Sequence, residues 1–278
     1  MDAYALKRAL ENMKTAAPLV HCITNYVTVN DCANAVLAVG ASPIMSDEPY
    51  DVQDITTLCN ALVLNIGTLN KRTIRGMKIA GDKATDLGRT IVLDPVGAGA
   101  SRFRTQVAGD LLDANKVTVI RGNMSEMKAL SGQATKTRGV DVNPDDAVTD
   151  ANLVECAHFA QKMAKDTGAV VAITGAIDIV ANADTAYAIR NGSPLMGRIT
   201  GSGCMLSCIT AAFATANKGR VLDATVAAVS GMGIAGEIAA ERMKPGDGNA
   251  TFRTYLIDAL YNLNADQLEQ RAKIQEVK

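Results

Sequence analysis

The chain has 278 residues, of which 28 are lysine or arginine and 29 are aspartate or glutamate, so its formal net charge is −1. This near balance argues against a polyanionic partner such as nucleic acid or an acidic membrane surface, and leaves a small molecule as the expected partner. The six cysteines include no CxxC pair, and most lie among small apolar residues. Such cysteines are typical of free thiols in a reducing compartment, hence the cytoplasm.

The N-terminal segment MDAYALKRALENMKTAAP carries charges throughout and has no continuous apolar core. It is therefore predicted to form a soluble amphipathic helix, because a signal peptide or a membrane span needs an uninterrupted apolar stretch.

Six short apolar runs follow, and they alternate with segments whose apolar residues recur at helical spacing. The predicted strands are at 18–23, 42–45, 61–66, 90–95, 117–122 and 169–174, and the predicted helices between them are at 30–39, 70–87, 103–114 and 151–167. This alternation predicts parallel β-α-β units and a layered α/β fold. Residues 177–190 predict an antiparallel hairpin near a sheet edge, and segments 203–217, 223–243 and 251–262 predict a helical last third.

One polar, turn-rich segment, from Gly132 to Asp150, could be either a domain boundary or a long surface loop. Predicted strands flank it on both sides, which favours an excursion from a single sheet. We therefore expect one domain that spans residues 1–278.

Polar and glycine-rich clusters follow most of the predicted strands. In open α/β sheets, ligands bind beyond the carboxyl ends of the strands, so these clusters are the first candidates for a site. They are HCITNYVT (21–28), Met45 with Ser46, NIGT (65–68), DPVGAGAS (94–101), RGNMSE (121–126), TG (174–175) and ITGSGCMLS (199–207).

The strongest single signal is the sequence Thr200-Gly201-Ser202-Gly203-Cys204 at the start of an alanine-rich apolar helix. Glycines at a helix start allow phosphate oxygens to approach free backbone N–H groups, and the helix dipole favours the negative charge. This predicts an anion hole, although the glycines could equally satisfy turn geometry with Ser202 as N-cap. The sequence is neither a Walker A motif nor a GxGxxG fingerprint.

Further candidates for phosphate and metal binding lie after other strands. Asp94 has the position of a magnesium ligand, or it could cap the following turn. Asn123 and Glu126 have the spacing of a capping box, and local evidence favours that role for Glu126. Arg121 could pair with a phosphate or with a surface carboxylate, and Thr174 could bind a nucleotide phosphate or simply end a strand. The chain has no clustered metal-binding histidines and no GxSxG elbow of a serine hydrolase.

Taken together and in this order, the motifs resemble those of the hydroxyethylthiazole kinase family of the ribokinase-like superfamily. The resemblance covers nearly the whole chain and is carried by HCITN, GASPIMS, ALVLNIGTL, VLDPVGAGAS, IRGNMSEMKALSG, VVAITGAIDIV and ITGSGCMLS. It implies a ribokinase-like layered fold, with a mostly parallel central sheet flanked by helices and no separate lid domain. It also implies an ATP- and Mg²⁺-dependent kinase that phosphorylates the hydroxyethyl alcohol of 4-methyl-5-(2-hydroxyethyl)thiazole in thiamine biosynthesis or salvage.

The resemblance assigns roles residue by residue. Asp94 and Glu126 would organise Mg²⁺, and Arg121 and Thr174 would contact ATP. The anion hole would be formed by Gly201, Ser202 and Gly203, and the thiazole would be bound by Met45, Gly67 and Gly201, with Asn25 nearby. The family also implies a homotrimer with active sites at subunit interfaces.

Cys204 occupies the position at which most ribokinase-like kinases have an aspartate base. The thiazole kinases resemble this chain in having cysteine there, so we expect Cys204 to position or deprotonate the alcohol. The alternatives are a ribokinase-like kinase of a hydroxymethylpyrimidine or pyridoxal-type alcohol, a superfamily enzyme that dehydrates a hydrated nicotinamide nucleotide, and a binding protein without turnover.

Overall fold

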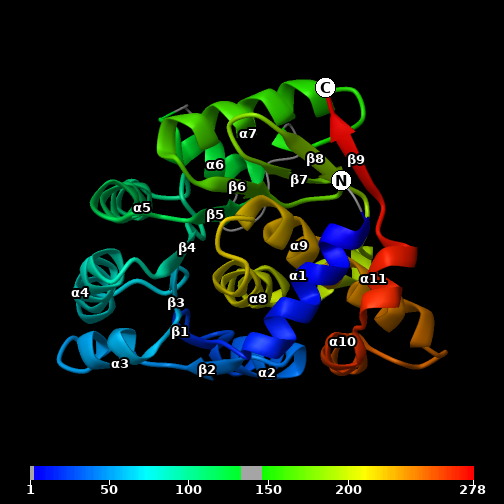
Figure 1. Ribbon diagram of the computed structural model, residues 1–278, viewed down its shortest axis with the longest axis horizontal. Coiled ribbons are helices and arrows are strands. Elements are labelled where there is room, and N and C mark those ends of the chain that lie inside the picture. The colour runs from blue at the N-terminus through cyan, green and yellow to red at the C-terminus, as the bar shows by residue number, and fades with distance from the viewer. Residues whose placement is uncertain (1–2, 133–145) are drawn as a thin grey trace.

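The computed structural model describes residues 3–132 and 146–278, and Figure 1 shows a central sheet with helices on both faces. Within the described residues, all nine strands join one sheet in the order β2-β1-β3-β4-β5-β6-β7-β8-β9. The first six are parallel, and β7, β8 and β9 are antiparallel to their neighbours. The strands are β1 (Leu19–Ile23), β2 (Ser42–Ile44), β3 (Ala61–Asn65), β4 (Thr90–Asp94), β5 (Val119–Gly122), β6 (Val170–Ile173), β7 (Asp178–Ala181), β8 (Ala186–Ile189) and β9 (Ile274–Val277).

The helices form two layers, one on each face of the sheet (Figure 1). Their bounds are α1 (Ala3–Ala16), α2 (Val29–Val39), α3 (Val52–Leu58), α4 (Lys71–Asp86), α5 (Arg102–Ala114), α6 (Met124–Leu130), α7 (Leu153–Thr167), η2 (Pro194–Arg198, a 3₁₀ helix), α8 (Ser202–Ala216), α9 (Val221–Arg242), α10 (Asn249–Asn262) and α11 (Ala265–Arg271).

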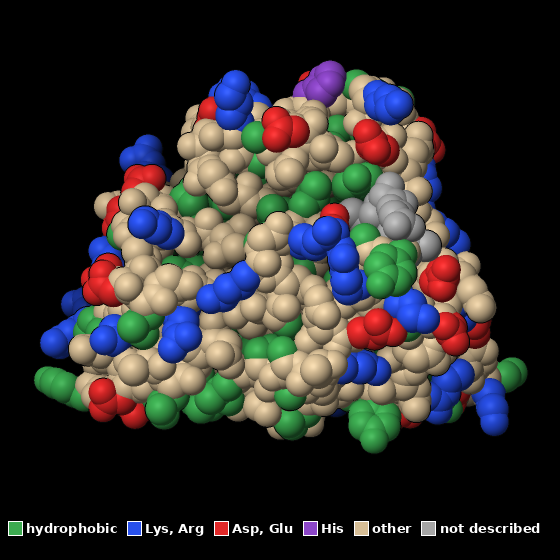
Figure 2. Space-filling view, in the orientation of Figure 1, with side chains coloured by type: hydrophobic (Ala, Val, Ile, Leu, Met, Phe, Trp, Pro, Cys, Tyr) green, Lys and Arg blue, Asp and Glu red, His purple; other side chains and the backbone are tan. Residues whose placement is uncertain are grey.

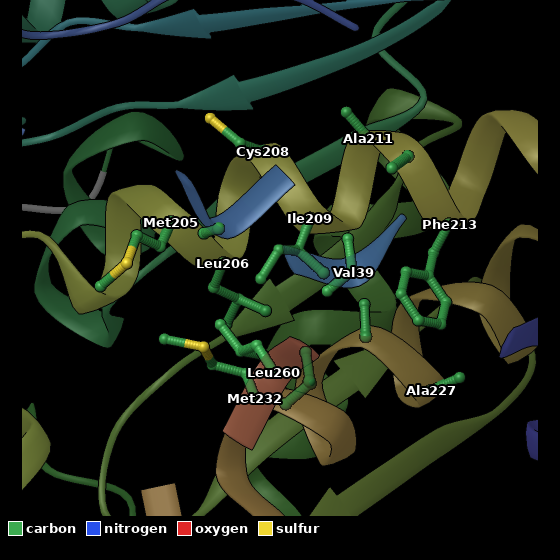
Figure 3. Close-up of a cluster of buried hydrophobic side chains, with 14 of the residues drawn as sticks. Val39, Met205, Leu206, Cys208, Ile209, Ala211, Phe213, Ala227, Met232 and Leu260 are labelled. Atoms are coloured by element: carbon green, nitrogen blue, oxygen red, sulfur yellow. The ribbon is translucent and has the colours of Figure 1, made fainter. Parts of the chain in front are cut away.

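The two layers enclose two separate apolar cores because successive strand residues point to opposite faces of the sheet. On β3, for example, Val63 packs into the core with α1, α2, α8, α9 and α10, whereas Leu62 and Leu64 pack into the core with α4, α5, α6 and α7. Figure 3 shows the first core around α8, where Ile209 and Phe213 lie near Val39 of α2 and Leu260 of α10. Helix α8 is thus held firmly against the middle of the sheet.

The predicted fold class is confirmed, and so are the six parallel strands and the antiparallel hairpin. The sequence analysis missed α3, η2, α11 and β9, which are short or polar; the last of these, Ile274–Val277, has two exposed residues among its four. Most of the segment from Gly132 to Asp150 lies outside the described residues. The strands on either side of it, β5 and β6, pair directly with each other.

Helix α9 is both long and apolar. Among the described helices, α9 alone has the length and apolarity of a membrane span, but 72% of its apolar window is buried inside the fold. Core packing therefore accounts for its composition.

On the face drawn in Figure 2, acidic and basic side chains are both scattered over the surface, in keeping with the near-zero net charge.

Candidate active site at the carboxyl ends of the parallel strands

The first turn of α8 lies where the carboxyl ends of the central strands meet. Gly201 precedes the helix with φ of +86°, a left-handed conformation that favours glycine, and no side chain caps the helix start. The helix packs against β1, β3 and β4, and its start lies near the ends of β1 and β4, because Asn25 donates to Cys204 and Ser207 donates to Asp94. This end of the helix therefore retains unpaired N–H donors and the positive end of the dipole for an anion.

Three glycines around this helix start make room for polar side chains. A Cβ placed on Gly67 would lie 2.8 Å from Asn25 Cβ, one on Gly201 would lie 2.5 Å from Thr28 Cγ2, and one on Gly203 would lie 2.6 Å from Arg121 Nη1. Contacts this short force the neighbouring side chain to move, so each glycine allows the side chain beside it to keep its position. The glycines of the sequence motif thus do more than make a turn.

Asp94, the last residue of β4, is fully buried. Its Oδ2 accepts hydrogen bonds from Ser207 Oγ (2.7 Å) and Asn65 Nδ2 (2.8 Å), and it lies 3.7 Å from Arg121 Nη1. Its Oδ1 is buried and has no hydrogen-bond partner. Burial raises the pKa of Asp94, and the three neighbours oppose this shift. An unpaired carboxylate oxygen in a buried position calls for a ligand.

Glu126 has the capping role considered for it, and it also lies near Asp94. Its Oε2 accepts from the backbone N–H of Asn123 (2.8 Å), which completes a capping box at the start of α6. Its Oε1 accepts from the N–H of Gly97 (2.8 Å), in the loop after Asp94. Burial, and secondly the charge of Asp94, raise the pKa of Glu126 to about 7. The cap therefore also brings a second carboxyl group close to Asp94.

These two acidic side chains fit a magnesium ion. Mg²⁺ is usually held in enzymes by one or two carboxylates together with water and substrate phosphates. The unpartnered Oδ1 of Asp94 offers one ligand. The described residues contain no cluster of three or more His, Cys, Asp or Glu that could hold a metal by itself, so any ion here would depend on oxygen atoms from a ligand.

Arg121 connects this acidic pair to a cavity of about 570 Å³. Its Nη2 donates to Thr174 Oγ1 (2.5 Å), while its buried Nε has no partner. The cavity is lined by both of these residues and by Ser202 and Gly203 of the α8 start. The structure therefore brings the predicted ATP-binding residues and two of the three predicted anion-hole residues into one cavity.

The predicted thiazole-binding residues lie outside the lining of this cavity. Asn25 donates from Nδ2 to Cys204 Sγ (3.1 Å) and lies against Gly67. Met45 follows directly after β2, beside β1, and packs on the core around α8. The group around Cys204 is thus separate from the residues that line the cavity.

Cys204 is buried, and burial, followed by the nearby charge of Asp94, raises its pKa to about 11. The thiol is therefore neutral near pH 7. A neutral thiol is a poor proton acceptor, which favours a positioning role for Cys204 over a role as base.

The sequence analysis missed three residues of this site, Thr28, Asn65 and Ser207. Each lies inside a motif that was singled out, but its importance depends on partners far away in the sequence. Asn65 and Ser207 both bind Asp94, and Thr28 donates from its N–H to Asn25 Oδ1 (3.1 Å). The sequence feature that could have indicated such residues is a polar residue at the end of an apolar run, or one on the apolar face of a helix.

Replacing Gly203 by alanine is expected to lower kcat/KM for the nucleotide by about 100-fold, because the new Cβ displaces the Arg121 guanidinium. The guanidinium is the end of a flexible side chain, and alanine favours helix, so thermal stability should change little. Steady-state kinetics and a thermal melt test this. Gly109→Ala on α5, where a Cβ meets no atom within 4 Å, is the matched control. Equal kinetics in the two variants would contradict the prediction.

The raised pKa of Glu126 predicts how stability depends on pH. Between the ordinary value of 4.5 and about 7, the folded protein holds a proton that the unfolded chain has lost. The free energy of unfolding of the metal-free protein should therefore fall as pH rises through this window, by roughly 3 kcal/mol. Glu126→Gln should flatten this slope in urea titrations. An unchanged slope in the variant would show that other groups cause it.

The mostly parallel sheet with helices on both faces places the chain among proteins of ribokinase-like fold. Two solved structures share this fold at low identity. They are a ribokinase-like superfamily protein of Enterococcus faecalis V583 (TM-score 0.61, 12% identity, 94% of each chain covered) and a pyridoxal kinase of Staphylococcus aureus (TM-score 0.60, 16% identity, 93% of this chain and 97% of the other).

The sequence model of the Hydroxyethylthiazole kinase family matches residues 10–266. A hydroxyethylthiazole kinase of Clostridium acetobutylicum is 52% identical over 268 residues, covering 96% of this chain and 98% of the relative. The solved structure of a hydroxyethylthiazole kinase protein from Pyrococcus horikoshii OT3 is 38% identical with a TM-score of 0.86, and covers 98% of this chain and 99% of the other. The chain belongs to the hydroxyethylthiazole kinase family.

Proposed function

We propose that the protein transfers the γ-phosphoryl group of ATP to the hydroxyethyl alcohol of 4-methyl-5-(2-hydroxyethyl)thiazole, and so supplies thiazole phosphate for thiamine biosynthesis or salvage. The single observation that carries this proposal is the unpartnered Asp94 Oδ1, which lies beside Arg121 and close to the glycine-rich start of α8. The names of full-length relatives at up to 52% identity support the choice of alcohol.

The residues of the site suit phosphoryl transfer. This reaction passes through a loose transition state, so alignment and neutralisation of charge matter most. In the proposal, Arg121 and Thr174 bind the phosphates in the cavity. The backbone N–H groups of Ser202 and Gly203 donate hydrogen bonds to the phosphoryl group as it is transferred. Asp94 and Glu126 hold Mg²⁺, which when bound neutralises phosphate charge.

The alcohol occupies the side opposite the cavity in this proposal. Gly67 and Gly201 present backbone to the thiazole, Met45 gives it an apolar contact, and Asn25 holds Cys204. The hydroxyl oxygen then lies in line with the γ-phosphate. The alcohol proton passes to a phosphate oxygen or to solvent, since the neutral Cys204 thiol does not accept it readily.

If Cys204 positions the alcohol, Cys204→Ala should lower kcat by about tenfold, less than the 10² to 10⁴-fold expected for loss of a general base. Cys204→Asp supplies a true proton acceptor and should equal or exceed the wild-type rate. Both kcat values can be read from ADP release. Full turnover by Cys204→Ala would remove the positioning role, and a loss of about a hundredfold or more would restore the role as base.

We also propose that the chain is a single kinase domain, is cytoplasmic, and assembles as a homotrimer with the thiazole site at the subunit interface. Support for one domain comes from the sheet, whose adjacent strands β5 and β6 flank the segment 133–145. Exposed Tyr26, Val27 and Tyr50 lie in the loops that follow β1 and β2, where a neighbouring subunit would pack. Light scattering that reports a monomer at assay concentration would refute the trimer.

The function is tested by ADP release with ATP, Mg²⁺ and one of three alcohols, namely the thiazole, hydroxymethylpyrimidine or pyridoxal. We expect the thiazole to have the largest kcat/KM. Preference for another alcohol would agree with the fold and with phosphoryl transfer, but would show that the proposed substrate is wrong. No turnover with any of the three would favour a binding protein.

A further inference from the structure

A chain of buried amides connects Asp94 to Cys204. Asn65, the last residue of β3, is 1% exposed. Its Nδ2 donates to Asp94 Oδ2 (2.8 Å), and its Oδ1 accepts from Asn25 Nδ2 (3.2 Å). The same Nδ2 of Asn25 donates to Cys204 Sγ (3.1 Å). Side chains from four separate segments thus form one continuous hydrogen-bonded path.

The direction of each bond in this path is fixed by groups that cannot reverse. The backbone N–H of Gly67 only donates, and it lies 3.0 Å from Asn65 Oδ1, so the oxygen of this amide must face Gly67 and Asn25. On the other side, the N–H of Thr28 only donates and lies 3.1 Å from Asn25 Oδ1. Neither amide can flip without leaving two donors facing each other, which is costly in a buried place.

We infer that Asn65 is a positioning residue for phosphoryl transfer: it orients Asn25 so that the sulfur of Cys204 accepts a hydrogen bond and stays fixed beside the alcohol. The inference rests on the proposed function and goes beyond it, because it couples the carboxylate that would hold the metal to the group that faces the alcohol. Asn65 itself touches neither reactant.

A purely structural role for Asn65 is the competing explanation, since its bond to Gly67 also shapes the turn after β3. That role predicts a loss of stability with unchanged chemistry. The inference instead predicts an effect that reaches Cys204 through Asn25 and is absent when either member of the path is already missing.

The first test measures the reactivity of Cys204 and needs no turnover. The rate at which iodoacetamide alkylates Cys204 is followed by mass spectrometry of the peptide that contains it. Asn65→Ala and Asn25→Ala should each lower this rate about fivefold, because the N–H donor that stabilises the thiolate is lost or misdirected. Cys204 in the double variant should be alkylated no more slowly than in Asn25→Ala alone. Unchanged or faster alkylation in Asn65→Ala, or additive losses in the double variant, would overturn the inference.

The second test uses kinetics, with Asn217→Ala as the matched control. Asn217 is a buried amide at the opposite end of α8, and its Nδ2 donates to Ala9 O (3.0 Å) and Phe213 O (2.9 Å). Asn65→Ala should lower kcat about tenfold, as expected for the loss of Cys204 itself, with the KM for ATP nearly unchanged. Asn217→Ala should lose similar thermal stability and keep its kcat.

The two tests separate failure of this inference from failure of the proposed function. If the wild-type protein does not phosphorylate the thiazole, the proposed function is wrong. The alkylation rates still decide whether Asn65 orients Cys204. If the wild-type protein is active and Asn65→Ala retains its kcat and its alkylation rate, the inference falls and the function stands.

Discussion

Asp94→Asn is expected to lower kcat by roughly a thousandfold and to leave the fold intact. Ser207 and Asn65 both donate to Oδ2 of Asp94, so the amide oxygen of the new asparagine must take that position. Its NH₂ group then replaces the unpartnered Oδ1 and points a donor at the place where the metal would bind. The variant thus keeps the internal hydrogen bonds while it removes the charge and the metal ligand.

This prediction is checked by kcat measurements over a range of Mg²⁺ concentrations, together with a thermal melt. Removal of a buried carboxylate whose pKa is raised by burial should not destabilise the metal-free protein strongly. Asp110→Asn, on the surface beside Lys78, controls for the loss of one carboxylate. A kcat within tenfold of the wild-type value would mean that Asp94 does not hold the metal.

Arg121→Met is expected to affect both stability and activity. The guanidinium is the cation nearest to buried Asp94, so its loss leaves that carboxylate unpaired and should lower the free energy of unfolding by about 3 kcal/mol. It also removes the contact with Thr174 and the positive charge in the cavity, and kcat/KM for ATP should fall by about a thousandfold.

Arg121→Lys separates the two effects. Lysine keeps a positive charge near Asp94 but cannot form the same fork toward Thr174, so it should recover most of the stability and only part of the activity. Urea titrations and steady-state kinetics at saturating thiazole provide the measurements. Full activity in Arg121→Met would remove this residue from the nucleotide site.

Much of the fold could be predicted because buried parallel strands appear as continuous apolar runs, as in TIVLD of β4. β9 could not be predicted in this way. Only two of its four residues IQEV are apolar and two are exposed, and it is a strand only because β8 offers it a free edge. Its formation depends on long-range pairing that no local pattern records.

The same distinction holds in the site. The glycine-rich and polar clusters after strands indicated residues that the structure brings together around the start of α8. The sequence could not show that Gly203 makes room for Arg121, or that Asn65 joins Asp94 to Asn25, because these relations exist only between distant segments. Cys204 is the clearest case. Burial and the charge of Asp94, which depend on segments distant in the sequence, raise its pKa to about 11.

The most direct test of the central claim is a product analysis, in which ADP and thiazole phosphate are quantified together in reactions that contain ATP, Mg²⁺ and 4-methyl-5-(2-hydroxyethyl)thiazole. We expect the two products to appear in equal amounts and ADP formation without the thiazole to be negligible. ADP formed without thiazole phosphate, or no ADP at all, would contradict the assignment of this site as a thiazole kinase.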